Sequence, residues 1–390
     1  MSKIIPYGKQ KILKRDFKAI NEALKADFIT GGKYVEKFEK DFCFYTKSKY
    51  AVSCSSGTAA IHLALESINI CKNDVIIIPA INFIAAANMS KKLGAKIYLA
   101  DVDPILGQMT PKNLLDCIKQ NKIKKLKAFF SMYNGGNPNF VKEFFKIKKK
   151  YNSFFLEDAC HALGAKYSIK EKLKVGDCKY SDIALFSFHP VKSITTGEGG
   201  MITTSNNSIY ERCKRFRNHG IMRRKNTKKK YYWKYEIQES GYNYRLSDLN
   251  SALGSSQLKN LDRFIQKRKK ISEIYNKKLR RRDEIITLPK ISKNQTSAWH
   301  LYIININFNK LEITREDLIQ KLYEKKIITQ VHYIPTYKQP VFLKLKTKKL
   351  VNSLKYYNSS VSLPIYVDLT IKDQVYIVKN LLKIINDYKK

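Results

Sequence analysis

The stretch FSFHPVKSITTGEGG, residues 186–200, decides the fold of this 390-residue chain. It begins as a short apolar strand, and Lys192 lies between that strand and a turn rich in threonine and glycine. Similar apolar segments lie before and after it, and the predicted strands are 75–79, 96–100, 126–131, 153–157, 182–188 and 200–204. Predicted helices lie between several of them, at 84–93, 111–120 and 138–151. This alternation predicts βαβ units and a mostly parallel sheet in an α/β fold.

Charged side chains stand at the ends of two of these predicted strands. Glu157 and Asp158 close the strand 153–157, and Lys192 follows the strand 182–188. Ligands of such sheets bind outside the carboxyl ends of the strands. A lysine amine can form an imine with the aldehyde of pyridoxal 5'-phosphate, while a carboxylate keeps the pyridine nitrogen protonated. The pair Lys192 and Asp158 therefore predicts an enzyme that uses this cofactor, with Lys192 as its catalytic residue.

Two further segments at this edge of the sheet are candidates for holding the cofactor phosphate. Gly57 and Thr58 open a predicted helix directly after the strand 50–54, and free amides at a helix N-terminus bind phosphate. An ordinary helix cap is the alternative for these residues. The hydroxyl of Ser187 is the second candidate.

Two more residues are candidates for contacts with the cofactor ring. Phe83 follows a predicted strand and is placed to stack on a flat heterocycle, and core packing is its alternative. His161 lies one turn after Asp158 and is placed to reach the cofactor's ring oxygen or Asp158, and a structural role is its alternative. For Glu157 we expect structural hydrogen bonds.

The sequence lacks the signature motifs of several enzyme classes. The absence of GxSxG, of GxGxxG after a strand, of a P-loop and of HExxH argues against serine hydrolases, nicotinamide enzymes, nucleotide hydrolases and zincins. The seven cysteines are scattered without a CxxC pair, so we expect neither a metal site nor a disulfide framework. The N-terminus lacks the shape of a signal peptide, and the apolar run 75–89 is too short to span a bilayer. We therefore expect a cytoplasmic protein without a membrane partner.

The formal net charge of +41 has two explanations. One is a surface that binds nucleic acid, which the basic and aromatic segment 230–235 also favours. The other is a general bias of composition, because lysines are spread through nearly every segment. We favour the bias and do not expect nucleic acid as a partner. A non-catalytic nucleic-acid-binding protein built on the same fold is kept as an alternative.

In combination, these residues resemble the sugar aminotransferases of the DegT/DnrJ/EryC1/StrS family. The resemblance covers nearly the whole chain and rests on five segments, 55–60, 157–159, 186–200, 217–221 and 241–248. It implies the aspartate-aminotransferase fold, which is fold type I of the PLP-dependent transferases. In that fold a large domain with a mostly parallel mixed sheet is joined to a smaller C-terminal α+β domain. It also implies a homodimer whose active sites are shared between the subunits.

The resemblance gives each candidate residue a role. Lys192 is the residue that binds the cofactor covalently. A sister enzyme that removes a sugar hydroxyl carries histidine at this position, so Lys192 argues against that activity. Asn243 reaches the cofactor phosphate from the partner subunit, and a turn asparagine before a helix cap is its alternative. The residues implied to contact the cofactor are Gly57, Thr58, Phe83, Asp158, Ser187 and Asn243, and His161 joins them as a cofactor-binding candidate by its position.

Two segments narrow the resemblance to one branch of the family. Residues 5–8 and 330–335 resemble the aminotransferases of pseudaminic acid biosynthesis. These enzymes move an amino group from L-glutamate to C4 of a UDP-linked 4-keto-6-deoxy-N-acetylhexosamine. By this resemblance Tyr7 and His332 lie beside the nucleotide sugar. Amination at C3 or C4 of a dTDP- or GDP-linked keto sugar remains the alternative.

Two other segments affect this assignment. The basic loop around Arg223, Arg224 and 228–230 is a candidate for binding the substrate diphosphate. The segment 130–138 departs from the usual sequence of the family. We therefore expect the contacts that it makes beside the cofactor to differ from those of the family.

The chain is predicted to form two domains. Residues 1–255 are expected to form the large cofactor-binding domain with an N-terminal arm, and 256–390 a linking helix and the small C-terminal domain. We expect one long helical stretch over 247–282. The small domain is expected to contain strands at 301–306, 327–333 and 361–363.

Overall fold

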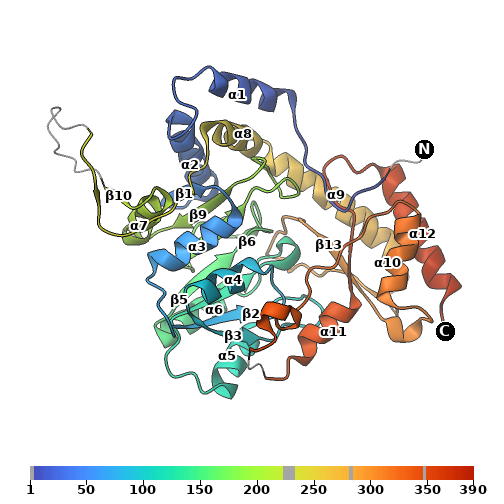
Figure 1. Ribbon diagram of the computed structural model, residues 1–390. Helices are drawn as coiled ribbons and strands as arrows, with labels where there is room; N and C mark the ends of the chain where they lie inside the picture. Colours follow the sequence, from blue (N-terminus) through green and yellow to red (C-terminus); the bar gives the residue numbers. More distant parts are fainter. Residues whose placement is uncertain (1–3, 223–232, 281–283, 346–347) are drawn as a thin grey trace.

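The computed structural model describes residues 4–222, 233–280, 284–345 and 348–390 (Figure 1). The basic residues Arg223, Arg224 and 228–230 lie outside the described residues.

A seven-stranded sheet forms the centre of the larger part of the molecule (Figure 1). Its strands are β1 (Tyr50–Cys54), β2 (Val75–Pro79), β3 (Lys96–Ala100), β4 (Ala128–Met132), β5 (Phe154–Asp158), β8 (Ile183–Ser187) and β9 (Gly200–Thr204). They lie in the order β1-β9-β8-β5-β4-β2-β3. Parallel pairing joins β3, β2, β4, β5 and β8, whereas β9 runs antiparallel to both β8 and β1. The sheet is therefore mixed and mostly parallel, as the alternation of elements predicts.

Helices cover both faces of this sheet, because successive strand residues point to opposite sides. Phe129 and Phe186 belong to one core, which α2 (Lys33–Thr46), α5 (Pro111–Gln120) and α6 (Val141–Tyr151) cover. Their neighbours Phe130 and Leu185 belong to the other core, beneath α3 (Gly57–Ser67), α4 (Ala85–Lys92) and α7 (Asn207–Arg217). Strands buried on both faces read as continuous apolar runs, which is the pattern of the sequence here.

The long helix expected over 247–282 is wrong as a single element. Helix α8 (Asp248–Leu258) packs on α1 (Lys14–Leu24) and α2, and a new helix, α9 (Leu261–Leu279), follows it. The break occurs where the amide of Asn260 bonds to the carbonyl of Gln257, one residue short of helical spacing. Apolar periodicity continues through such a break, so the pattern alone does not reveal it.

A three-stranded antiparallel sheet forms the smaller part of the molecule. Its core contains Tyr275 and Leu279 of α9, whereas Leu261 and Phe264 of the same helix belong to the first core. Helix α9 thus joins the two cores, and the boundary between 255 and 256 remains our proposal. The elements of this part are β12 (Ile286–Thr287), β13 (Tyr302–Ile306), β14 (Ser360–Leu363), α10 (Arg315–Glu324), α11 (Val351–Ser359) and α12 (Ile371–Asp387).

The expected strand at 327–333 is wrong. The segment makes only single bridges, from Ile327 to Ile5 and from Gln330 to Ser362. Because it pairs with the N-terminal arm at one end and with β14 at the other, it has no continuous ladder with either. Its end instead brings His332 toward the large domain.

Two helices also differ from expectation. The helix predicted from 138 begins at Val141, because Phe140 takes a left-handed backbone conformation with φ 64°. Helix α7 was not predicted, although Asn206 caps it by accepting the amide of Ser208 at 2.8 Å. Short elements complete the fold: β6 (Lys166–Ser168), β7 (Leu173–Lys174), β10 (Ile221–Met222), β11 (Glu236–Ile237), η1 (Asn134–Gly136), η4 (Phe308–Lys310), η5 (Thr336–Lys338) and η6 (Pro340–Phe342).

Candidate active site

A cavity of about 540 Å³ lies at the carboxyl ends of β4, β5 and β8. The last residue of each strand lines it, namely Met132, Asp158 and Ser187. His300 and Tyr333 from the C-terminal part close it from another side. Nine of the ten predicted site residues line the cavity: Tyr7, Gly57, Thr58, Phe83, Asp158, His161, Ser187, Lys192 and His332.

Lys192 extends into this cavity from the turn that follows β8. Its backbone amide donates to the carbonyl of His189 at 2.9 Å, which fixes the start of the turn. Burial lowers the pKa of the amine, and the nearby Cys160 and Asp158 only partly offset that effect. A larger fraction of this amine is therefore neutral than in an exposed lysine.

Asp158 is buried at the end of β5, with 3% of its surface exposed. Burial raises the pKa of its carboxyl group, while the hydrogen bond from Cys160 and the charge of Lys192 lower it. The amide of Cys160 donates to its Oδ1 at 3.2 Å. A buried carboxylate with few donors is ready to bind a positively charged group of a ligand.

The start of α3 forms the second wall of the cavity. Ser56 caps this helix, because its hydroxyl accepts the amide of Ala59 at 3.1 Å. The amides of Gly57 and Thr58 precede the first intrahelical bond, which Ala60 donates to Ser56. A β-carbon on Gly57 would stand 2.9 Å from the Cβ of Ser187, so only glycine fits here without a shift. The arrangement is a cradle for an anion.

Three of the histidines that line the cavity, His161, His300 and His332, lie close together. The rings of His161 and His300 lie 4.2 Å apart, and His332 lies 6.4 Å from His161. Burial lowers the pKa of His161 and of His300 well below the usual range, and the charge of Lys192 adds to the effect. The same causes lower the pKa of His332 to about 3. All three rings are therefore neutral near pH 7.

Three aromatic rings line the cavity, those of Tyr7, Phe83 and Tyr333. Phe83 is half exposed, and its ring contacts that of Tyr333 at 5.8 Å. Its exposure rules out the core-packing alternative and leaves the ring available for stacking on a ligand. Tyr7 contacts His332, with ring centroids 5.8 Å apart.

Asn243 is the predicted residue that does not line this cavity within the described chain. It makes a backbone bridge with Asn218 near the end of α7. Its implied role requires a second subunit and therefore stays a prediction.

Glu157 points away from the cavity, as its place before Asp158 on a strand requires. Its carboxylate accepts hydrogen bonds from the hydroxyls of Tyr133, at 2.8 Å, and of Tyr167. Burial raises its pKa to about 7. The expected structural role is confirmed.

The unusual segment 130–138 packs directly behind the cavity. A β-carbon on Gly136 would stand 2.5 Å from the carbonyl oxygen of His161, and this glycine has φ 102°. The side-chain amide Nδ2 of Asn134 donates to the hydroxyl of Tyr356 at 2.7 Å. The segment therefore supports His161 from behind, and it contributes Met132 to the cavity itself.

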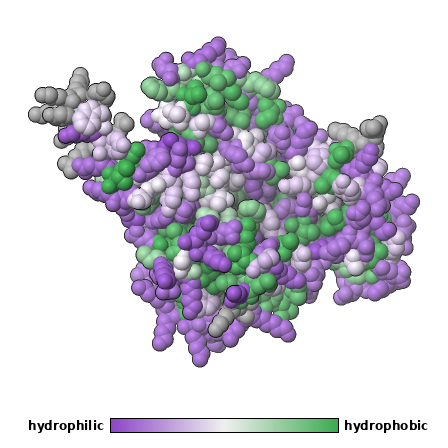
Figure 2. Space-filling view, viewed as in Figure 1, coloured by the Kyte–Doolittle hydropathy of each residue, from purple (hydrophilic) through white to green (hydrophobic). Residues whose placement is uncertain are grey.

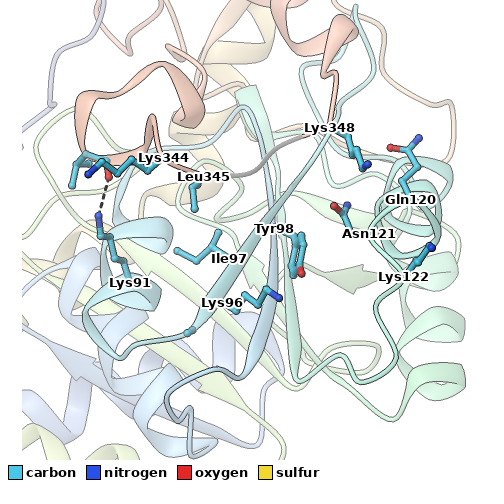
Figure 3. A pocket seen from close by; sticks show the side chains of 12 residues that line it. Lys91, Lys96, Ile97, Tyr98, Gln120, Asn121, Lys122, Lys344, Leu345 and Lys348 are labelled. Carbon is cyan, nitrogen blue, oxygen red and sulfur yellow. Dashed lines mark hydrogen bonds between the residues drawn. The ribbon is translucent and has the colours of Figure 1, made fainter.

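A second cleft, of about 700 Å³, lies beside the edge strand β3 (Figure 3). No carboxylate or histidine lines it among the described residues, and two of its five lysines have structural explanations. Lys91 sits in the last turn of α4, where a cation is favourable, and donates to the carbonyl of Val341 at 2.8 Å. Lys96 lies on the edge strand, where lysine discourages pairing with another sheet. We therefore place the chemistry in the first cavity.

The sequence profile of the DegT/DnrJ/EryC1/StrS aminotransferase family matches residues 10–382. The chain belongs to this family. A protein of Campylobacter jejuni (serotype O:23/36, strain 81-176), named UDP-4-amino-4,6-dideoxy-N-acetyl-beta-L-altrosamine transaminase, is 36% identical over 388 residues, with 99% of each chain covered. The GDP-perosamine synthase of Escherichia coli O157:H7 is 30% identical over 387 residues, with 99% of this chain and 100% of that protein covered.

A solved structure shows the same likeness. Helicobacter pylori PseC, an aminotransferase involved in the biosynthesis of pseudoaminic acid, matches with a TM-score of 0.89 and 29% identity. The match covers 99% of this chain and 100% of that one. The predicted fold class, the fold type I architecture of PLP-dependent transferases, is confirmed.

Pyridoxal 5'-phosphate is the cofactor of this aminotransferase family, and the cavity fits it. The amine of Lys192 and the carboxylate of Asp158 both reach the one cavity, at the ends of adjacent strands. The cradle at Gly57, Thr58 and Ser187 has amides and a hydroxyl that would hold the phosphate. The missing β-carbon at Gly57 keeps that cradle open.

His300 and Tyr333 are among the cavity residues that were not predicted. His300 has no motif around it, and only its position after β12 and before β13 brings it to the site. Tyr333 directly follows His332 in a segment that the resemblance singled out. Its aromatic side chain next to a predicted substrate residue was the signal that could have identified it.

Proposed function

We propose that this enzyme transfers the amino group of L-glutamate to C4 of a UDP-linked 4-keto-6-deoxy-N-acetylhexosamine. The product would enter pseudaminic acid or a related surface-glycan amino sugar. The observation that carries this proposal is the Lys192–Asp158 cavity in a chain that matches, end to end, a transaminase named for such a UDP-sugar. Tyr7 and His332, which mark this branch in the sequence, contact each other in the same cavity.

The residues of the cavity suit this reaction. When bound, pyridoxal 5'-phosphate supplies an aldehyde that carries the amino group and a ring that accepts electrons. Lys192 removes the proton from the α-carbon of glutamate and later delivers a proton to C4 of the sugar, because burial leaves its amine partly neutral. Asp158 holds the proton on the ring nitrogen, and burial in the cavity strengthens that interaction.

A GDP-linked keto sugar is the second candidate substrate. The 30% identity to GDP-perosamine synthase over nearly the full length of both chains favours it. The chemistry at Lys192 is the same for both substrates, so only the groups that bind the nucleotide distinguish them.

An assay panel tests the choice. The purified holoenzyme is incubated with L-glutamate and a UDP-, GDP- or dTDP-linked 4-keto-6-deoxy sugar, and the amino sugar is detected by mass spectrometry. We expect the highest kcat/KM with the UDP-linked N-acetylhexosamine, and NMR of its product should place the amino group on C4. A preference for the GDP-sugar, or amination at C3, would contradict the proposal.

We infer further that the enzyme acts as a homodimer with shared active sites. Large apolar side chains are exposed on and after α1, and Figure 2 shows an apolar patch over this part of the molecule. The patch consists of Phe17, Leu24, Phe28 and Ile29, which are between 49% and 71% exposed. Such contiguous apolar surface supports a subunit interface. A second subunit would also give Asn243 the phosphate contact that it lacks within one chain.

We also infer a cytoplasmic location. All seven cysteines are free thiols, and four of them are buried. Free cysteines in this number are typical of a reducing compartment. Within the described residues, no helix combines the length and apolar character needed to cross a membrane.

A further inference from the structure

Tyr333 and His161 share a hydrogen bond at the wall of the cavity. The hydroxyl oxygen of Tyr333 lies 2.9 Å from Nε2 of His161. Ring contacts with Phe83, at 5.8 Å, and with His332, at 5.0 Å, hold the tyrosine in place. The question that decides its chemistry is which partner donates the hydrogen.

The second nitrogen of His161 indicates the direction of this bond. Burial and the charge of Lys192 keep the ring neutral, so only one of its nitrogens carries a proton. Nδ1 is buried and has no hydrogen-bond partner among the described residues. A proton there would be a buried N–H donor without an acceptor, which folded proteins rarely contain. With the proton on Nε2, His161 donates to the hydroxyl oxygen of Tyr333. Nδ1 then has only a lone pair without a hydrogen-bond partner, which costs less than an unpaired N–H.

This direction leaves the hydrogen of the Tyr333 hydroxyl free. The described residues provide no other hydrogen-bond partner for that hydroxyl, and Tyr333 lines the cavity. Burial and the nearby Asp158 and Cys160 raise the pKa of Tyr333 well above its usual value, so the hydroxyl keeps its proton near pH 7. It is therefore a donor available to a ligand.

We propose that Tyr333 binds the substrate by donating its hydroxyl hydrogen to the carbonyl oxygen of the keto sugar, with His161 holding the tyrosine oxygen in place. Transamination replaces this carbonyl oxygen by an amino group, so negative charge develops on the oxygen before it leaves as water. A fixed donor at that oxygen stabilises the developing charge. The bond received from His161 strengthens the donor, because linked hydrogen bonds polarise one another. The inference rests on the proposed function, since it requires a keto substrate in the cavity.

The direction of the bond can be measured without cofactor or substrate. Nitrogen NMR of the cofactor-free protein with labelled histidine reports which nitrogen of His161 is protonated, and the His161→Gln spectrum assigns the signal. We expect a protonated Nε2, and we expect its resonance to shift in Tyr333→Phe. A proton on Nδ1 would overturn the inference.

Kinetics test the role in the reaction. Tyr333→Phe keeps the ring and removes the donor, so kcat with the keto sugar should fall about 100-fold. The dissociation constant of pyridoxal 5'-phosphate should stay within about twofold, because the ring contacts remain. Tyr275→Phe is the matched control, since its buried hydroxyl donates to the carbonyl of Pro364 at 2.9 Å in the small-domain core. This control should keep kcat, and a folded Tyr333→Phe enzyme with unchanged kcat would overturn the inference.

The two proposals fail in different ways. An enzyme that aminates no keto sugar would contradict the proposed function. An active enzyme with the proton on Nδ1, or with unchanged kcat in Tyr333→Phe, would overturn only the role of Tyr333.

Discussion

Gly57 and Ser187 approach each other so closely that a β-carbon on Gly57 would stand 2.9 Å from the Cβ of Ser187. Gly57 begins α3 and Ser187 ends β8. Their contact therefore places the N-terminus of a helix at the edge of the sheet where ligands of parallel sheets bind. Glycine leaves the first helical amides open to an anion. This relationship provides a direct test of the phosphate cradle.

Gly57→Ala should weaken the binding of pyridoxal 5'-phosphate about 10-fold or more. The added methyl forces Ser187 or the start of α3 to shift, and both belong to the cradle. Equilibrium dialysis of the cofactor-free variant measures the effect. Gly8→Ala is the control, because its nearest contact would be an ordinary one, 3.5 Å from the Cβ of Val191. Equal cofactor affinity in Gly57→Ala and the wild type would contradict the cradle.

Asp158→Asn should lower kcat by about 100-fold or more. The substitution keeps the shape of the side chain and removes the charge that, in our proposal, holds the proton on the cofactor's ring nitrogen. Steady-state kinetics at saturating cofactor measures the loss. Asp177→Asn removes a buried aspartate outside the cavity and should keep kcat. Full activity in Asp158→Asn would show that another group has this role.

Glu157 should make stability depend on pH. Burial raises its pKa to about 7 from an ordinary value of 4.5. Between these two values the folded protein keeps a proton that the unfolded chain has released, so stability falls as the pH rises through this window. The wild type should lose about 3 kcal/mol of its free energy of unfolding across this window, and Glu157→Gln should not show this loss.

Urea unfolding at about pH 4 and about pH 8 measures the difference, because these two conditions lie on either side of the titration window. Glu211→Gln, an exposed residue on α7, should keep the wild-type pH dependence. If Glu157→Gln lost as much stability as the wild type between the two conditions, the buried carboxyl group would not be the cause.

Phe28→Arg should convert the proposed homodimer into monomers. Phe28 is 71% exposed, and a charge there would have to be buried in the interface without a partner. Light scattering after size-exclusion chromatography gives the mass. Val375→Arg, at an exposed position on α12, should stay dimeric. A monomeric wild-type protein would contradict the proposal, as would a Phe28→Arg variant that remains dimeric.

The site residues at the ends of strands could be predicted, because the end of a strand can be recognised from the residues next to it in the sequence. Asp158 and Lys192 follow apolar runs whose carboxyl ends meet in any parallel sheet. His300 and Tyr333 were missed because the docking of the small domain brings them to the cavity, and no periodicity encodes that docking. The strand expected at 327–333 is wrong for a related reason, since Ile327 pairs with the N-terminal arm and Gln330 with β14.

The central claim is that Lys192 carries the cofactor. Borohydride reduction of the holoenzyme fixes pyridoxal 5'-phosphate to the amine that holds it, and peptide mass spectrometry identifies that amine. We predict that the label lies on Lys192 alone and that Lys192→Ala shows neither label nor turnover. A label on another lysine, or turnover by Lys192→Ala, would contradict the account.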